Sequence, residues 1–256
     1  MTPSQTVKLA IEDQVARITL DRPKHNVFTI GMIEELNALL ARLAEDNSIK
    51  CVVLFGEGPS WCAGVDVGDH KAEMVDRMIA VFKRSFELIE AIEAPIIAAV
   101  HGACLGGGME YAIACDLIIA SEKATFGQPE VRLGFLPPYA AVRLPQLVGP
   151  AKAIEICAGG RIYSAADAQT LGFVSQVTRE DDFTSTVAKR IQDFKNASPL
   201  ILRLNKRAVK QHTRMTFDEA LSAVNDLFLN TLMKTQDTAE GMASFFEKRR
   251  PRWKNR

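Results

Sequence analysis

The chain has 256 residues, of which 47% are hydrophobic and 24% are charged. That length suffices to bury a sizeable core in one globular domain, or in one domain with a small appendage. Lys plus Arg and Asp plus Glu both number 31, so the formal net charge is zero. Because phosphate neutralisation needs a concentrated excess of Lys and Arg, this balance disfavours a basic nucleic-acid-binding protein, and we expect no nucleic-acid partner.

The five cysteines are odd in number, widely spaced and without a C-x-x-C pair. This usage favours a reducing compartment, in which cysteines serve as small hydrophobic residues. The N-terminal segment lacks the basic and apolar regions of a signal peptide. The most apolar region, Ala94–Ala120, is interrupted by His101, Glu110 and Asp116, whereas a membrane span needs about 20 nearly uninterrupted apolar residues. We therefore expect a soluble cytoplasmic protein with no membrane contact.

The first two thirds of the chain alternate between short apolar strands and segments with helical periodicity. Runs of four to six apolar residues are typical of buried strands, and alternation of strands with helices predicts an α/β fold. In chain order the predicted segments are the hairpin Val7–Ile11 and Val15–Leu20, the helix Ile30–Leu43, the strand Cys51–Phe55, a helix within about Lys71–Ile92, and the strands Pro95–Val100 and Leu117–Ala120.

The pattern changes after about Asp182, where helical periodicity dominates. We divide the chain into an α/β core, residues 1–195, and a helical C-terminal region, residues 196–256, which we expect to pack against another surface such as a second subunit. The helices predicted here are Asp182–Asn196, Pro199–His212, Thr216–Lys234 and Asp237–Arg249, with breaks at Ser198-Pro199 and Thr213–Met215.

Two glycine-containing segments, Trp61–Asp66 and His101–Glu110, each follow a predicted strand. Glycine lets the backbone approach a ligand closely. If Gly107 or Gly108 begins a helix, free N–H groups and the positive end of the helix dipole face that ligand, and two such donors from separate loops would form an oxyanion hole. For an isolated Gly-Gly-Gly, tight turns and close packing are the favoured explanation. A phosphate-binding loop is disfavoured because neither G-x-x-x-x-G-K-[ST] nor G-x-G-x-x-G fits.

Glu110 and Glu130 both stand among apolar residues, where desolvation would raise the carboxyl pKa and suit proton transfer near neutral pH. Taken singly, each is better explained as a surface residue or a charge at a helix N-terminus. For His101, a strand-end side chain bonded to backbone is favoured over a catalytic base. No ligand cluster predicts a metal, no G-x-S-x-G marks a nucleophile, and Cys62 is expected to be buried and inert.

Read together, these segments resemble the enoyl-CoA hydratase/isomerase (crotonase) family over essentially the whole chain. Each segment is modest alone, but their order and spacing are specific. The segments are Cys62–Asp66 (CAGVD), Pro95–Gly102 (PIIAAVHG), Leu105–Glu110 (LGGGME), Phe126–Glu130 (FGQPE) and Glu240–Arg249 (EGMASFFEKR).

The resemblance implies a core of repeated ββα units and an acyl-CoA thioester as substrate, with coenzyme A part of that substrate and no separate cofactor. It implies that the N–H groups of Val65 and Gly107 polarise the thioester carbonyl. Glu110 and Glu130 would hold water and exchange protons, with Glu130 donating to the α-carbon. Because some family members that isomerise or cleave bonds lack one glutamate, the presence of both favours hydration.

The resemblance also implies a homo-oligomer, a trimer or a dimer of trimers, in which the C-terminal helices complete the coenzyme A site of a neighbouring subunit. Basic residues and an aromatic residue would contact coenzyme A, although Lys248 could equally be part of a cationic helix end that complements the dipole. The positions implied for coenzyme A or the acyl group are Arg22, Lys24, Ala63, Asp66, Pro138, Tyr139, Phe228 and Lys248.

The chain departs from many family hydratases after Glu130. Leu136–Val142 (LPPYAAV) replaces a glycine-rich segment, so Pro138 stands where a glycine is usual. Proline fixes φ and removes an N–H, so the acyl pocket should be reshaped. This feature, the Asp66–His70 segment and the C-terminal sequence are similar to cyclohexa-1,5-diene-carbonyl-CoA hydratases, which implies a cyclic dienoyl-CoA in place of a linear enoyl-CoA.

Two alternatives stay open. The same scaffold could support an enoyl-CoA isomerase or an acyl-CoA hydrolase. From a different class, the chain could be a non-catalytic relative that binds coenzyme A or RNA. Zero net charge disfavours RNA, and the presence of both Glu110 and Glu130 disfavours a silent relative.

Overall fold

The computed structural model describes residues 5–210 and 215–256. Among these residues, six strands form a sheet in the order β1-β2-β3-β5-β7-β10. The pair β1 and β2 is antiparallel, as the alternating sequence around the Asp13-Gln14 turn predicts, and every other pair is parallel. The strands are β1 (Val7–Glu12), β2 (Val15–Leu20), β3 (Cys51–Gly56), β5 (Ile96–Val100), β7 (Leu117–Ser121) and β10 (Gln176–Thr178).

A second sheet, in the order β4-β6-β8-β9, consists of strands of three residues each. Its strands β4, β6 and β8 are mutually parallel, and each follows a longer strand of the first sheet in the chain. This repeat of a long strand and a short strand is what the predicted ββα units require. The bounds are β4 (Ser60–Cys62), β6 (Ala103–Leu105), β8 (Thr125–Gly127) and β9 (Ile162–Ser164).

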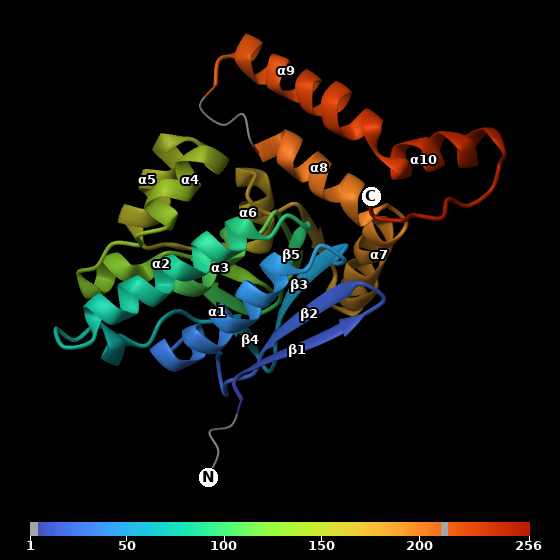
Figure 1. Cartoon of the computed structure of the whole chain (residues 1–256). Helices are drawn as coiled ribbons and strands as arrows, with labels where there is room; N and C mark the ends of the chain where they lie inside the picture. Colours follow the sequence, from blue (N-terminus) through green and yellow to red (C-terminus); the bar gives the residue numbers. More distant parts are fainter. Residues whose placement is uncertain (1–4, 211–214) are drawn as a thin grey trace.

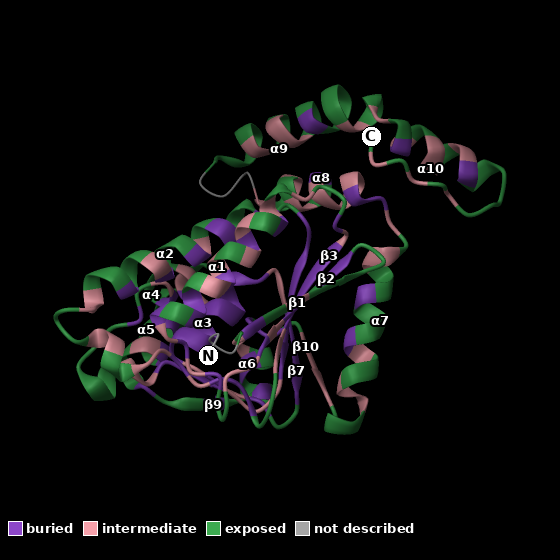
Figure 2. Ribbon diagram, turned by 60° about the horizontal axis from the view of Figure 1, so that its bottom comes forward, coloured by how far each residue is buried: buried purple, intermediate pink, exposed green. Residues whose placement is uncertain are grey.

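Helices cover both faces of the larger sheet, and Figures 1 and 2 show α1, α2 and α3 on one side and α7 on the other. The helices are α1 (Ile30–Glu45), α2 (Val75–Ala91), α3 (Gly107–Ala114), α4 (Ala140–Val148), α5 (Pro150–Gly159), α6 (Ala165–Leu171), α7 (Phe183–Lys195), α8 (Pro199–Lys210), α9 (Phe217–Asp226) and α10 (Gln236–Phe246). Shorter helices are η1 (Val67–His70), η2 (Pro129–Leu133), η3 (Glu180–Asp182), η4 (Leu227–Thr231) and η5 (Leu232–Lys234).

The main core lies between the larger sheet and α1, α2 and α3. Its largest fully buried side chains include Trp61, Tyr111 and Phe28, and burying an apolar side chain contributes about 1.5–3 kcal/mol. Every residue of α3 is buried, so this helix is surrounded by protein on all sides (Figure 2). A smaller core on the opposite face of the sheet is closed by α7 through Val187 and Ile191. The α/β fold predicted from the sequence is confirmed.

The C-terminal region is helical, as predicted, and lies at one end of the molecule, with α9 and α10 beyond α8 (Figure 1). Residues 211–214, which include the end of the predicted helix Pro199–His212 and part of the break after it, lie outside the described residues. The chosen boundary at residue 195 coincides with the end of α7, and the division into two units stays a prediction. In the described ranges, no helix is both long and apolar enough to cross a membrane.

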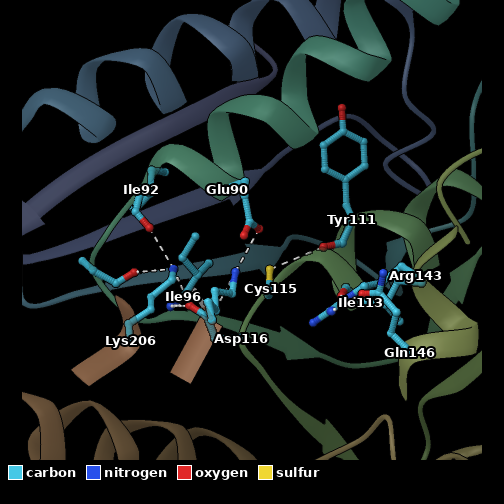
Figure 3. Close-up of polar contacts among 12 residues, drawn as sticks. Glu90, Ile92, Ile96, Tyr111, Ile113, Cys115, Asp116, Arg143, Gln146 and Lys206 are labelled. Carbon is cyan, nitrogen blue, oxygen red and sulfur yellow. Dashed lines mark hydrogen bonds and ion pairs between the residues drawn. The ribbon is translucent and has the colours of Figure 1, made fainter. Parts of the chain in front are cut away.

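A buried ion pair attaches α8 to the α/β core (Figure 3). The Nζ atom of Lys206 lies 2.6 Å from Asp116 Oδ2 and donates to the carbonyl oxygens of Ile92, at 2.8 Å, and Ala94, at 2.9 Å. The side chains of Lys206 and Asp116 are only 8% and 17% exposed. Asp116 Oδ2 also accepts from the N–H of Ile96, so α8 is tied to the start of β5. Desolvation lowers the pKa of Lys206, and the charge of Asp116 opposes that shift.

We predict that Lys206→Met lowers the free energy of unfolding by about 3 kcal/mol, because it removes the buried cation paired with Asp116 and leaves the carbonyls of Ile92 and Ala94 without their donor. The matched control is Lys189→Met on the exposed face of α7, which should change stability by less than about 0.5 kcal/mol. Urea unfolding followed by circular dichroism at fixed protein concentration measures both variants. Equal midpoints for the two variants would show that this pair does not hold α8 to the core.

Candidate active site

Three segments leave the second sheet at the same edge, because β4, β6 and β8 are neighbouring parallel strands. The chain continues from β4 into Ala63–Asp66, from β6 into Gly106 and α3, and from β8 into Gln128 and η2. Parallel alignment therefore brings together residues that are more than 60 positions apart in the sequence, which is how parallel sheets commonly assemble ligand sites.

Glycine is required where the first two segments meet. A Cβ atom on Gly107 would lie 2.5 Å from Val65 Cγ2. Gly106 has φ +52, a conformation that favours glycine, and a Cβ there would lie 2.9 Å from Glu130 Oε1. The two glycines thus allow the loop after β6 to contact both neighbouring segments. Helix α3 begins at Gly107, one of the two starting points that the sequence predicts.

The N–H groups of Val65 and Gly107 have no protein acceptor among residues 5–210 and 215–256. The neighbouring backbone groups, by contrast, are bonded. Phe28 donates to Gly64 O at 2.8 Å, and Asp66 donates to Phe28 O at 2.8 Å. Two donors, one of them at the N-terminus of a helix, are therefore left for a ligand.

Both residues line a cavity of about 660 Å³ that also holds Glu110 and Glu130. Most of its other side chains are apolar, and His70 and Arg132 are the remaining polar ones. The apolar side chains come from the segment after β4, from α2, and from η2 and the stretch that follows it. They are Ala63, Val67, Val75, Met78, Ile79, Phe82, Pro129, Leu133, Phe135, Leu136 and Pro138.

Glu110 is only 2% exposed and is held by the first turn of α4. Its Oε1 atom accepts from the N–H of Tyr139 at 2.7 Å and from the N–H of Ala140 at 2.8 Å. Burial raises the pKa of Glu110 to about 8, with a smaller raising contribution from the charge of Glu130, while the two N–H donors act in the opposite direction. Because both donors occupy Oε1, a proton on this carboxyl group sits on Oε2.

Glu130 is partly buried at the start of η2, and burial raises its pKa to about 7. The side chain of Gln128 is fully buried beside it. With its amide nitrogen facing the carboxylate, Gln128 donates to Oε1 at 2.9 Å and to Oε2 at 3.0 Å. Sequence reasoning missed this partner, and the only available signal was its place inside the Phe126–Glu130 segment.

The pKa values near 7 and 8 place the two carboxyl groups close to the point at which they share one proton at neutral pH. Because like charges repel each other, ionisation of Glu130 raises the pKa of Glu110. The site can therefore hold one acid and one base at once, as general acid–base chemistry requires.

Two of the residues implied as substrate contacts, Ala63 and Pro138, line the cavity, whereas Asp66 and Tyr139 do not. Asp66 accepts from the N–H of Gly68 at 2.8 Å and caps η1. Tyr139 reaches Glu110 through its backbone, and its ring stacks on Phe86 with the centroids 3.8 Å apart. Both residues thus support the walls of the cavity.

The residues implied for coenzyme A fall in two places. Arg22 and Lys24 follow β2, and Arg22 Nη2 lies 4.0 Å from Asp66 Oδ2, so this loop packs beside the cavity. Phe228 in η4 and Lys248 after α10 are exposed and do not line the cavity of their own chain. The segments that carry them adjoin α9 and α10, which lie beyond α8 in Figure 1.

His101 and Cys62, which the sequence analysis interprets as non-catalytic, have environments that fit this interpretation. His101 Nε2 lies 2.8 Å from Gly58 O, in agreement with a strand-end histidine bonded to backbone. Cys62 is completely buried, and burial raises the pKa of its thiol to about 12. A thiol that stays protonated at neutral pH is a poor nucleophile, so Cys62 is inert, as expected.

The sequence is similar to that of known enoyl-CoA hydratases along nearly its whole length. The family model for enoyl-CoA hydratase/isomerase matches residues 10–256. A probable enoyl-CoA hydratase of Rhizobium meliloti is 35% identical, with 98% of this chain and 99% of that protein covered. A crotonyl-CoA hydratase of Syntrophomonas wolfei is 34% identical, with 96% of each chain covered.

The fold comparison leads to the same family. The crystal structure of an enoyl-CoA hydratase from Bacillus anthracis superposes with a TM-score of 0.93 at 29% sequence identity, covering 98% of this chain and all of that one. The arrangement of the two sheets and of the C-terminal helices is therefore shared across the whole length. The chain belongs to the enoyl-CoA hydratase/isomerase family.

Proposed function

We propose that this protein is a hydro-lyase of the enoyl-CoA hydratase type, which adds water across a conjugated acyl-CoA double bond or removes it. The observation that carries the proposal is the meeting of Glu110 and Glu130 in one mostly apolar cavity beside the unpaired N–H groups of Val65 and Gly107. The names of the relatives support the same activity.

In the proposed mechanism, the N–H groups of Val65 and Gly107 donate to the thioester oxygen. Attack of water at the β-carbon moves electrons toward that oxygen, so these two bonds strengthen as the enolate-like state forms. Loss of one such donor typically costs about 2.7–4 kcal/mol of barrier. Because both donors belong to backbone that glycine contacts hold in place, they need no rearrangement during the reaction.

The two glutamates divide the proton transfers. Glu110 accepts a proton from the attacking water as the oxygen bonds to the β-carbon, and Glu130 donates a proton to the α-carbon. Because the pKa of Glu110, about 8, lies above that of Glu130, about 7, the state with Glu110 ionised and Glu130 protonated is the less populated of the two singly protonated states. The N–H groups of Tyr139 and Ala140 raise its population by stabilising ionised Glu110. One proton is gained and one is lost, so no redox partner is involved. We propose that the reaction uses no cofactor apart from the coenzyme A of the substrate.

We further propose that the acyl group is a cyclic dienoyl such as cyclohexa-1,5-diene-carbonyl. Support comes from the similarity of the Leu136–Val142 segment to hydratases of that substrate and from the wide, mostly apolar cavity that Pro138 helps to line. Proline at this position offers no N–H to the reacting centre.

We also propose a homo-oligomer, a trimer or a dimer of trimers, in which Phe228 and Lys248 contact the coenzyme A bound by a neighbouring copy. Support comes from the large apolar side chains that the C-terminal helices leave exposed, because aromatic side chains are enriched in the interfaces between subunits. Phe217, Phe245 and Phe246 are 78%, 78% and 79% exposed.

The test of the function is a substrate panel of crotonyl-CoA and cyclohexa-1,5-diene-carbonyl-CoA. We expect loss of conjugated-thioester absorbance without release of free thiol, and the cyclic substrate should have the higher kcat/KM. Release of thiol would indicate a hydrolase, and movement of a double bond without water addition would indicate an isomerase. Absence of water addition to both substrates contradicts the proposal.

We predict that Glu130→Gln lowers kcat at least about 100-fold while acyl-CoA affinity changes little, because the amide keeps the size of the carboxyl group but cannot transfer its proton. Steady-state kinetics and calorimetric binding of a saturated acyl-CoA measure the two effects. The matched control is Glu12→Gln, at an exposed position in β1, which should leave kcat unchanged. A near-normal kcat in Glu130→Gln would remove this residue from the mechanism.

The pH dependence follows from the pKa values of about 7 for Glu130 and about 8 for Glu110. At low pH both carboxyl groups are protonated and no base is available. At high pH both are ionised and no acid is available. We therefore predict a bell-shaped profile of kcat/KM with its maximum between pH 7 and 8. A rate that is constant from pH 6 to pH 9 is incompatible with this assignment.

A further inference from the structure

The cavity contains one polar side chain that the proposed mechanism does not use and that the structure holds in a fixed orientation. His70 ends η1 and lines the cavity together with Glu110 and Glu130. Its Nδ1 atom lies 2.9 Å from the carbonyl oxygen of Asp66. A carbonyl oxygen only accepts, so Nδ1 carries the hydrogen, and in the neutral ring Nε2 presents a lone pair.

Two further contacts restrict the imidazole ring. One face stacks on Phe135, with ring centroids 4.8 Å apart and an interplanar angle of 26°. The helix that carries His70 is itself anchored, because Asp69 Oδ2 accepts from the N–H of Ile30 at 2.8 Å at the start of α1. Within the described parts of the chain, no residue forms a hydrogen bond with His70 Nε2. A preoriented side chain with an unused acceptor is thus part of the wall of a mostly apolar cavity.

Polar groups that are few and fixed in an apolar pocket commonly set the orientation and the specificity of a ligand. An acceptor nitrogen selects a donor, and the neutral oxygen substituent that donates is a hydroxyl group. We propose that His70 is a specificity residue that binds, through Nε2, a hydroxyl group carried by the acyl moiety beyond the β-carbon. This inference rests on the proposed function, in that it takes the cavity to hold the acyl group.

Arg132, the other polar side chain of the cavity lining that the mechanism does not use, would select a different chemical group on the ligand. It is exposed and has only donors, so it suits a carboxylate at the cavity mouth. His70 is half-buried, and its contacts with Asp66 and Phe135 leave less freedom. The hydroxyl preference is therefore assigned to His70. The experiment must distinguish a preference caused by His70 from one caused by Arg132.

The test is binding of saturated, unreactive acyl-CoA esters, which does not depend on catalysis. Calorimetry compares hexanoyl-CoA with its 5-hydroxy and 6-hydroxy derivatives, and cyclohexanecarbonyl-CoA with its 3-hydroxy and 4-hydroxy derivatives. Hydroxyl groups at the β-position are left out because the two glutamates would bind them. We expect at least one hydroxylated ester to bind about tenfold more tightly than its parent.

Two variants separate a ligand contact from a merely structural role. In His70→Gln the amide can place an acceptor near the position of Nε2, whereas in His70→Asn the amide can replace only the Nδ1 donor to Asp66. We expect His70→Gln to retain most of the hydroxyl preference, and His70→Asn to lose it while binding the parent esters normally.

Three results would overturn the inference. They are the absence of a hydroxyl preference in the unmodified protein, a preference that survives in His70→Asn, and a preference that only Arg132→Met removes. Failure of the hydratase function would appear separately, as a lack of water addition in the substrate panel.

Discussion

The contact among three loop segments at the edge of the second sheet is the constraint on which the site depends. Gly106 and Gly107 lie so close to Glu130 and Val65 that a side chain at either position would collide with them. That closeness follows from the parallel order of β4, β6 and β8. The larger sheet and its covering helices fix where those short strands lie, so the packing of the core determines the positions of both backbone donors and of both carboxyl groups.

Burial and hydrogen bonding act against each other at the two glutamates. Burial raises both pKa values into the neutral range, and the N–H groups of Tyr139 and Ala140 limit the effect at Glu110. Gln128 supplies the corresponding donor at Glu130. If both carboxyl groups were fully exposed, both would be ionised at neutral pH. If both were buried without hydrogen-bond donors, both would be protonated. The intermediate environment allows one group to act as acid while the other acts as base.

The sequence predicts strands β1, β2, β3, β5 and β7 of the larger sheet, because they are alternating or continuous apolar runs. It does not predict β10 of that sheet or any strand of the second sheet, since three residues are too few to show any period. The family resemblance identifies Glu110 and Glu130 as a pair, but the roles of Gln128 and His70 depend on contacts between segments that no local pattern encodes. Helices α4, α5 and α6 are also missed. In α4, Pro137, Pro138 and the internal Pro145 obscure the helical signal.

The central claim is that both carboxyl groups transfer protons while water adds across the double bond. Isotope incorporation during turnover of crotonyl-CoA tests it most directly. In D₂¹⁸O, single-turnover products analysed by mass spectrometry and NMR should contain one deuterium at the α-carbon and one ¹⁸O at the β-carbon. Deuterium uptake at the α-carbon without oxygen at the β-carbon would contradict the account, because it would show that the pair only exchanges protons with the acyl group.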